Sequence, residues 1–171
     1  MRKTISPILS LLLSALVLTL ASSCENDEEF VRILTGKTWK MSRLTENGSS
    51  SQFYLTWDTE EEYETSMSYF TVSSYYVITF EGVEYDGELV GNEVTLRGVN
   101  RSATGTWTAS GENHAMSLDL TFSGAGDETD PLAIAFINGI QNVYRYEGDE
   151  NNLNLFFKDD GETYVIGFVP R

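Results

Sequence analysis

A strict alternation of apolar and polar residues constrains the fold of this chain more than any other feature. Apolar residues occupy every second position of one short segment: Met116, Leu118, Leu120 and Phe122. Successive side chains of a β-strand point to opposite faces of a sheet, so this period of two predicts a strand with one buried face and one wet face. The chain must therefore build at least part of a β-sheet.

The same period returns in several other segments, which are separated by turn residues. The further predicted strands lie at residues 38–41, 76–80, 94–96, 153–157 and 164–168. Glycine beside asparagine or an acidic residue marks the breaks at residues 81–82, 90–92, 110–113, 147–149 and 159–161. Short strands joined in this way favour an antiparallel meander. The predicted fold class is mainly β (α+β), with a strongly curved sheet or barrel and one packed amphipathic helix.

That helix is predicted at residues 131–142, in the segment DPLAIAFINGIQN. Asp130 is a good N-cap, and Pro131 suits the first helical position. Leu132, Phe136 and Ile140 follow at four-residue spacing, which places them on one face of a helix of about three turns. We expect this face to pack on the sheet.

Residues 58–70 are ambiguous. Tyr63, Met67 and Phe70 have helical spacing, and the acidic residues before them favour a helix start, but β-formers stand at both ends. We expect a long excursion that contains one or two helical turns.

The N-terminal segment has the pattern of a secretory signal. Arg2 and Lys3 precede an apolar run at residues 8–20, which is shorter than the roughly 20 residues of a membrane span, and small residues lead to Cys24. The segment resembles a bacterial lipoprotein signal, which implies a signal peptide at residues 1–23 and a lipidated Cys24. The alternative is an unlipidated export signal with a free or buried cysteine. Acylation is favoured because Cys24 is the only cysteine, and an exported protein rarely keeps an unpaired thiol.

Four carboxylates follow the cysteine: Glu25, Asp27, Glu28 and Glu29. Like charges repel and cannot be buried together, so residues 24–32 are predicted to be a solvated tether before a domain at residues 33–171. The acidic run also resembles the export signal of surface lipoproteins of the Bacteroidetes. This resemblance implies an outer-membrane lipoprotein at the cell surface, and a periplasm-facing anchor is the alternative.

Charge excludes one class of partner. Removal of residues 1–23 changes the formal net charge from −15 to −17, because Arg2 and Lys3 leave with the signal. Nucleic acid is bound mainly by Lys and Arg that neutralise phosphates, so such an acidic domain is not expected to bind it. The expected partners are the membrane, through the lipid anchor, and either a protein or a small apolar ligand, and we expect a monomer.

No residue pattern predicts catalysis, a cofactor or a metal. His114 is the only histidine and lies in a turn segment, so neither a zinc site nor a Ser-His-Asp triad has its usual residues. Acidic clusters at residues 58–62 and 159–162 offer oxygen ligands for calcium, but the spacing is not that of an EF-hand. A solvated helix start and a hairpin turn explain these clusters better. We expect a protein that is not an enzyme.

Aromatic residues offer one opening for ligand binding. Trp57, Tyr63, Tyr69 and Tyr76 concentrate within a short part of the chain. Aromatic faces with polar tips suit a ligand surface, so these four residues are the predicted ligand-binding residues. The alternative is that they belong to the core and the rim of the barrel.

The order of these segments resembles the META domain of HslJ-like lipoproteins. The matching stretches are LTGKTWKM, VITFEG, TGTWTASGENHAMSLDLTF and DPLAIAFINGIQNV. A second resemblance, through the Gly36-x-x-Trp39 opening and the meander, is to lipocalin-like lipoproteins. The first implies a non-enzymatic binding or envelope-maintenance module, and the second implies a carrier of a small apolar ligand. Neither family supplies a catalytic residue for this chain.

Overall fold

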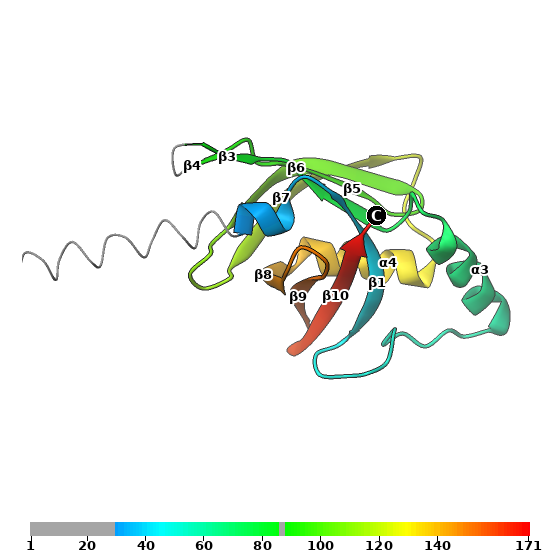
Figure 1. Ribbon diagram of the computed structural model, residues 1–171. Coiled ribbons are helices and arrows are strands. Elements are labelled where there is room, and N and C mark those ends of the chain that lie inside the picture. Colours follow the sequence, from blue (N-terminus) through cyan, green and yellow to red (C-terminus); the bar gives the residue numbers. More distant parts are fainter. Residues whose placement is uncertain (1–29, 86–87) are drawn as a thin grey trace, which may run out of the picture.

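The computed structural model describes residues 30–85 and 88–171 (Figure 1). The expected signal peptide, Cys24 and the four acidic residues after it lie outside the described residues. Ten strands and two longer helices follow an N-terminal helical turn at residues 30–34. None of the helices in the described part is both long and apolar enough to cross a membrane.

Eight of the strands form one antiparallel sheet in the order β7-β6-β5-β2-β1-β10-β9-β8. Their bounds are β1 Thr38–Glu46, β2 Val77–Phe80, β5 Glu93–Arg97, β6 Arg101–Ala109, β7 Met116–Gly124, β8 Val143–Gly148, β9 Leu153–Asp159 and β10 Glu162–Pro170. Strands of this sheet that are neighbours in space are also consecutive among its strands along the described chain. The exception is β10, the last strand, which pairs with β1. The predicted meander is therefore confirmed.

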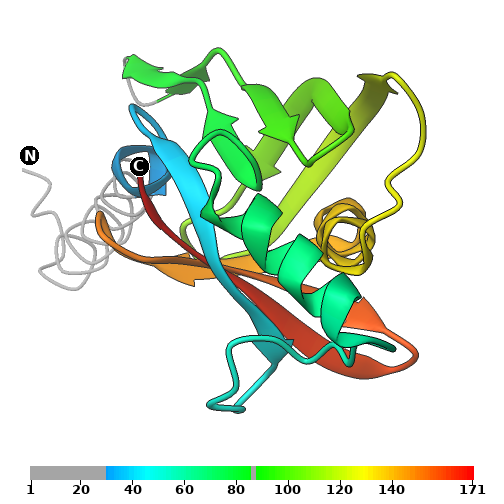
Figure 2. The same ribbon diagram turned by 90° about the vertical axis from the view of Figure 1, so that its right-hand side faces the viewer.

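The sheet curls until its two edge strands meet at one end. Ala115, just before β7, forms a bridge with Arg145 of β8, and the Tyr146 amide donates to the His114 carbonyl oxygen at 2.9 Å. The helix α4 (Pro131–Gln141) connects β7 to β8 and contacts β7, β9 and β10. Figure 2 shows it end-on between the two sides of the curled sheet. The fold is a strongly curled half-barrel whose open side holds a helix.

Helix α4 begins as its sequence predicts. Asp130 is the N-cap, its side chain accepts a hydrogen bond from the Ala133 amide at 2.9 Å, and Pro131 opens the helix. Seven of its eleven residues are buried, including Phe136. The helix approaches the sheet closely at Gly139, where an added Cβ would lie 2.9 Å from the ring of Phe157 and 3.0 Å from Ile166. The predicted packed helix is confirmed.

Side chains fill the inside of the curl. The largest that are completely or almost completely buried are Trp39, Trp107, Tyr76, Phe80, Phe136, Phe157 and Phe168. The two buried indoles are also hydrogen-bonded: Trp39 donates to the Leu34 carbonyl oxygen and Trp107 to that of Glu81, both at 2.9 Å. Burial of a polar indole N–H without a partner would be costly, so these bonds fix both rings in the core.

The structure corrects the expected extent of the helix near residues 58–70. Helix α3 runs over Glu60–Thr71, twelve residues, and is therefore longer than one or two turns. Thr59 caps it by accepting from the Glu62 amide, and Glu62 in turn accepts from the Asp58 amide at 3.0 Å. This reciprocal capping overrides the β-formers at both ends of the segment.

Two further regions differ from the expectations. Phe30 and Val31, which precede the expected boundary at residue 33, are buried in the core, so this end of the expected tether belongs to the domain. A small hairpin that was not predicted, β3 (Val83–Tyr85) and β4 (Glu88–Val90), forms a separate two-stranded sheet between β2 and β5. Figure 1 shows it projecting from the half-barrel.

Candidate functional site

Three of the four predicted aromatic residues, Trp57, Tyr63 and Tyr76, lie along one chain of ring contacts that fastens α3 to the core. Trp57 contacts Tyr63 edge-to-face, with ring centroids 5.2 Å apart. Phe53 links Trp57 to Phe70, at centroid distances of 6.0 and 5.2 Å. Phe70 in turn contacts Tyr76 at 6.2 Å. Most of this aromatic surface is therefore used to hold the excursion in place.

Tyr76 cannot belong to a ligand surface, because its side chain is fully buried. Its backbone has a φ of +52°, which is uncommon for a bulky residue and turns its ring into the core before β2 begins. The hydroxyl donates to Asp130 Oδ2 at 3.1 Å. Burial raises the pKa of Tyr76 well above its usual value, and the carboxylate of Asp130 raises it further. The prediction of a ligand-binding role was wrong for this residue.

Asp130 is the centre of a buried polar network that joins α3 to α4. Its Oδ2 accepts from Tyr76 and from the Ala133 amide, and its Oδ1 accepts from the Ser66 hydroxyl at 2.5 Å. Ser66 is the only fully buried residue of α3, and it accepts a hydrogen bond from the Trp57 indole at 2.8 Å. One carboxylate thus caps α4, anchors Tyr76 and positions α3.

Beside this network, α3 and the start of α4 flank an open hollow of about 390 Å³. Its lining residues are Thr59, Glu61, Glu62, Thr65, Tyr69, Thr129, Asp130 and Pro131. Tyr69 is the one predicted aromatic residue that lines it. Hydroxyls and carboxylates predominate, so the hollow offers hydrogen-bond acceptors and negative charge rather than an apolar surface.

The acidic groups of the hollow differ in how they are used. Glu62 is engaged in capping α3, and Asp130 already accepts hydrogen bonds from three partners within the protein. Glu61 is exposed and forms no ion pair with any residue in the described ranges. Glu61, Thr65 and Tyr69 are therefore the groups best placed to contact a bound molecule.

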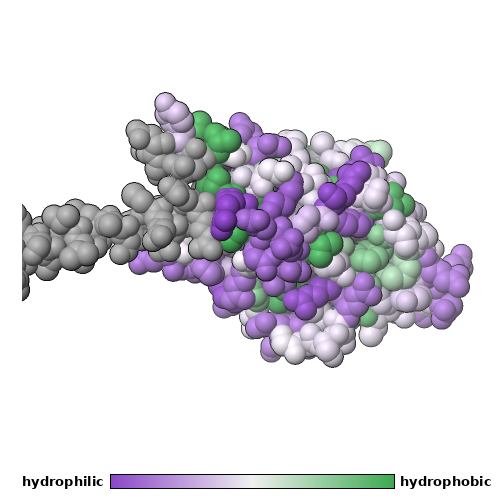
Figure 3. All heavy atoms as spheres, in the orientation of Figure 1, coloured by the Kyte–Doolittle hydropathy of each residue, from purple (hydrophilic) through white to green (hydrophobic). Residues whose placement is uncertain are grey.

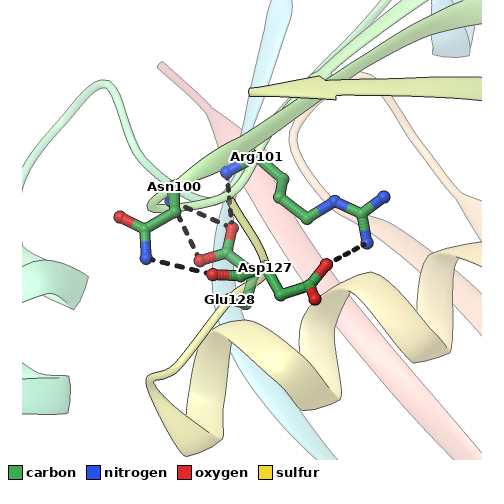
Figure 4. A network of polar contacts seen from close by, with 4 residues as sticks. All are labelled: Asn100, Arg101, Asp127 and Glu128. Carbon is green, nitrogen blue, oxygen red and sulfur yellow. Dashed lines mark hydrogen bonds and ion pairs between the residues drawn. The ribbon is translucent and has the colours of Figure 1, made fainter. Parts of the chain in front are cut away.

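A second buried carboxylate supports the start of α4 from the other side. Figure 4 shows Glu128 reaching into the turn between β5 and β6, where it accepts from the amides of Val99, Asn100 and Arg101 at 2.9–3.1 Å. An added Cβ at Gly98 would lie only 2.4 Å from Glu128 Oε1, so a side chain there would push the carboxylate away from its present position. The three amides of this turn therefore donate to Glu128, and these hydrogen bonds hold the β7–α4 connection against the sheet.

Lys40 secures the other end of α3. Its ammonium donates to the carbonyl oxygens of Val72 and Tyr75 at 2.9 and 2.7 Å and lies over the rings of Phe70 and Tyr76. Burial lowers the pKa of Lys40 to about 8, with a smaller contribution from the charge of Arg171. Lys40 therefore has a structural role: its ammonium binds the carbonyl oxygens at the end of α3 and two aromatic faces.

His114 and the two acidic clusters, the other polar groups that the sequence singles out, lie in turns or at a helix start. His114 is exposed, has a φ of +56° and stacks on Tyr146 with centroids 5.3 Å apart. The cluster at residues 58–62 starts α3, and the cluster at residues 159–162 forms the turn between β9 and β10. No group of three or more His, Cys, Asp or Glu residues is arranged to hold a metal ion in the part of the chain that the structure describes.

Comparisons with known proteins agree on one family. The profile of "Domain of unknown function (DUF4847)" matches residues 25–170. The chain is also similar to the crystal structure of a DUF4847 family protein from Bacteroides vulgatus ATCC 8482, with a TM-score of 0.58 and 19% identity over 82% of this chain and 96% of that chain. None of the curated proteins matches. The resemblances to META domains and lipocalin-like lipoproteins stay predictions, because these comparisons do not bear on them.

Proposed function

We propose that this chain, which belongs to the DUF4847 family, is a lipid-anchored protein of the bacterial envelope, exposed at the cell surface, that binds a partner without transforming it. The anchor is the acylated Cys24, which the lipoprotein-like signal at residues 1–23 supports. The acidic run at residues 25–29 supports surface display.

The observation that carries the binding role is the polar hollow between α3 and α4. It lies on a rigid support, because the buried network at Asp130 holds both helices in register. Rigid placement reduces the entropy that binding must overcome, which is a general property of binding sites. The lining favours a polar ligand or a polar segment of a partner protein.

The alternative function, a lipocalin-like carrier of a small apolar ligand, has less support. A carrier needs room inside its barrel, whereas here large side chains such as Trp39, Tyr76 and Phe136 occupy the inside of the curl. The open side of the half-barrel is also occupied, by α4. A filled sheet suits an interaction module that binds at its surface.

The anchor is tested by Cys24→Ala. We expect the variant to leave the membrane fraction and to fold normally, because Cys24 lies in the expected tether, outside the predicted domain at residues 33–171. Labelled fatty acid should enter the wild-type chain and not the variant. Retention of Cys24→Ala in membranes, or absence of label from the wild type, would disprove the anchor.

Surface display is tested by neutralising Glu25, Asp27, Glu28 and Glu29 together. Lipidation should persist, while protease added to whole cells should no longer reach the domain. If protease treats variant and wild type alike, the acidic run is only a spacer.

The hollow is tested by Thr65→Arg, which fills it from the exposed face of α3. Partners are captured from detergent-solubilised envelopes with the full lipoprotein. We expect Thr65→Arg to lose partners that the wild type retains. Ser68→Arg makes the same charge change three residues further along α3, outside the lining, and should retain them. Equal capture by both variants would remove the hollow from the binding surface.

A further inference from the structure

The projecting β3–β4 hairpin exposes an apolar face that no described part of the protein covers. Val83 and Val90 are paired across the strands and are 61% and 50% exposed, and Tyr85 is 73% exposed. Leu89 points the other way and packs against the core. Figure 3 shows apolar surface on this projection. Apolar side chains on a small ribbon would normally turn inward, so their exposure requires a reason.

The base of the hairpin and the start of the domain share one side chain. Phe30 contacts the Trp107 ring edge-to-face at a centroid distance of 6.2 Å. The Trp107 indole donates to the carbonyl oxygen of Glu81, and a Cβ at Gly82 would lie 3.5 Å from the same ring. The chain therefore enters the domain within a few side-chain widths of the hairpin.

Chain length then limits how far the membrane can be. Cys24 precedes Phe30 by six residues. Six residues span at most about 20 Å when fully extended, at roughly 3.3–3.6 Å each. A lipid on Cys24 would therefore hold the bilayer close to Phe30, on the side of the molecule where the hairpin projects.

We propose that the outward face of the β3–β4 hairpin, formed by Val83, Tyr85 and Val90, is a second contact with the bilayer. This inference rests on the lipid anchor proposed above. Tyrosine suits the boundary between headgroups and acyl chains, because its ring is apolar and its hydroxyl is polar. The contact would also orient the domain. Figure 1 shows α3 at the opposite end of the molecule from the hairpin, so the hollow beside α3 faces away from the membrane.

Charge selects the kind of bilayer. Glu81 and Glu93 are exposed at the base of the hairpin, and residues 24–171 carry a formal net charge of −17, because Arg2 and Lys3 leave with the signal. An anionic surface would repel such a protein. The hairpin contact is therefore strongest on headgroups without net charge and weaker when anionic lipid is added.

The test uses the full lipoprotein in vesicles of phosphatidylcholine. An acylated Cys24 has no free thiol, so Tyr85→Cys introduces a single labelling position for an environment-sensitive fluorophore. The matched control is Ser50→Cys, an exposed position beyond the far end of β1. Emission at position 85 should shift to shorter wavelength and be quenched by spin-labelled lipid, whereas emission at position 50 should do neither. Phosphatidylglycerol in the vesicles should reduce the effect at position 85.

The possible failures are distinct. Equal emission at positions 85 and 50 in an acylated, normally folded chain overturns the hairpin contact and leaves the anchor intact. A shift at position 85 that grows with protein density, without quenching by the lipid, shows that a second copy covers the hairpin and also overturns it. Absence of fatty acid from the wild-type chain disproves the proposed anchor, independently of the fluorescence result.

Discussion

The helices α3 and α4 lie side by side and depend on different interactions. Helix α4 has no charged side chain, and seven of its eleven residues are buried. Helix α3 has four glutamates among twelve residues, and Ser66 is its only fully buried residue. The two helices meet at the hydrogen bond between Ser66 and Asp130.

This difference separates the part of the molecule that stabilises the fold from the part that is free to vary. Burial of apolar surface is the dominant favourable term in folding, so the apolar face of α4 contributes directly to stability. The outer face of α3 contributes little burial, and its capping groups and aromatic contacts hold it in place. Substitutions on the outer face of α3 can therefore alter the lining of the hollow without unfolding the protein.

The largest expected effect is that of Phe136→Ala in α4. Phe136 is fully buried and contacts Tyr76 and Phe168, so its removal leaves a cavity. We expect a loss of about 3–5 kcal/mol, from a total stability of about 5–15 kcal/mol, measured by chemical denaturation. The control Asn138→Ala changes an exposed residue of the same helix and should cost little. Equal midpoints for both variants would show that α4 is not docked.

The next effect is that of Asp130→Ala at the junction of the two helices. It removes the N-cap of α4 and leaves the Tyr76 and Ser66 hydroxyls without their acceptor. We expect a loss of about 2–4 kcal/mol, because a lost cap and a buried unsatisfied group cost roughly 1–3 kcal/mol each. Asp127→Ala removes an exposed carboxylate paired with Arg101 and should change the unfolding free energy by less than about 1 kcal/mol. Similar losses would mean that the network does not couple the helices.

Alkaline pH should act through Tyr76. Its folded-state pKa is raised by burial and by Asp130, so above about pH 10 the unfolded chain releases a proton that the folded protein keeps. The contribution of Tyr76 is therefore complete below pH 10 and declines as the pH rises further. Tyr76→Phe should cost about 1 kcal/mol at neutral pH and lose less stability between pH 9 and 11 than the wild type. Parallel pH profiles would contradict this account.

The smallest effect is expected on the outer face of α3. Glu64→Ala replaces an exposed side chain outside the hollow, for which changes within about 0.5 kcal/mol are usual. Thermal unfolding should barely shift. A loss comparable to that of Phe136→Ala would end the distinction between the two helices.

Sequence patterns predicted α4 better than α3 for a local reason. The cap, the proline and the four-residue spacing of α4 all lie within one short segment, and each favours the same helix. In α3, Thr59 and Glu62 form a capping pair that favours a helix, whereas the β-formers around the segment favour a strand. The Thr-x-x-Glu spacing was a signal that could have extended the prediction.

The candidate site was only partly predictable. Of the aromatic residues near residues 57–76 that predict a ligand surface, Tyr69 lines the hollow. Tyr76 was misplaced because an aromatic residue near a strand has the same pattern whether it faces a ligand or the core. Ser66 and Asp130 are 64 positions apart, and Glu128 binds amides 27–29 positions away, so no local pattern could pair them.

The sequence by itself determined the alternating strands, their turns and the capped helix α4, because each depends on residues a few positions apart. Only the tertiary structure decided that the meander closes through β10 on β1, that α4 fills the open side, and that the core includes Phe30. It alone brought α3 and α4 together around Asp130 and left the hairpin face exposed. Such contacts join residues distant in the chain, and their energies depend on which surfaces meet when the whole sheet curls.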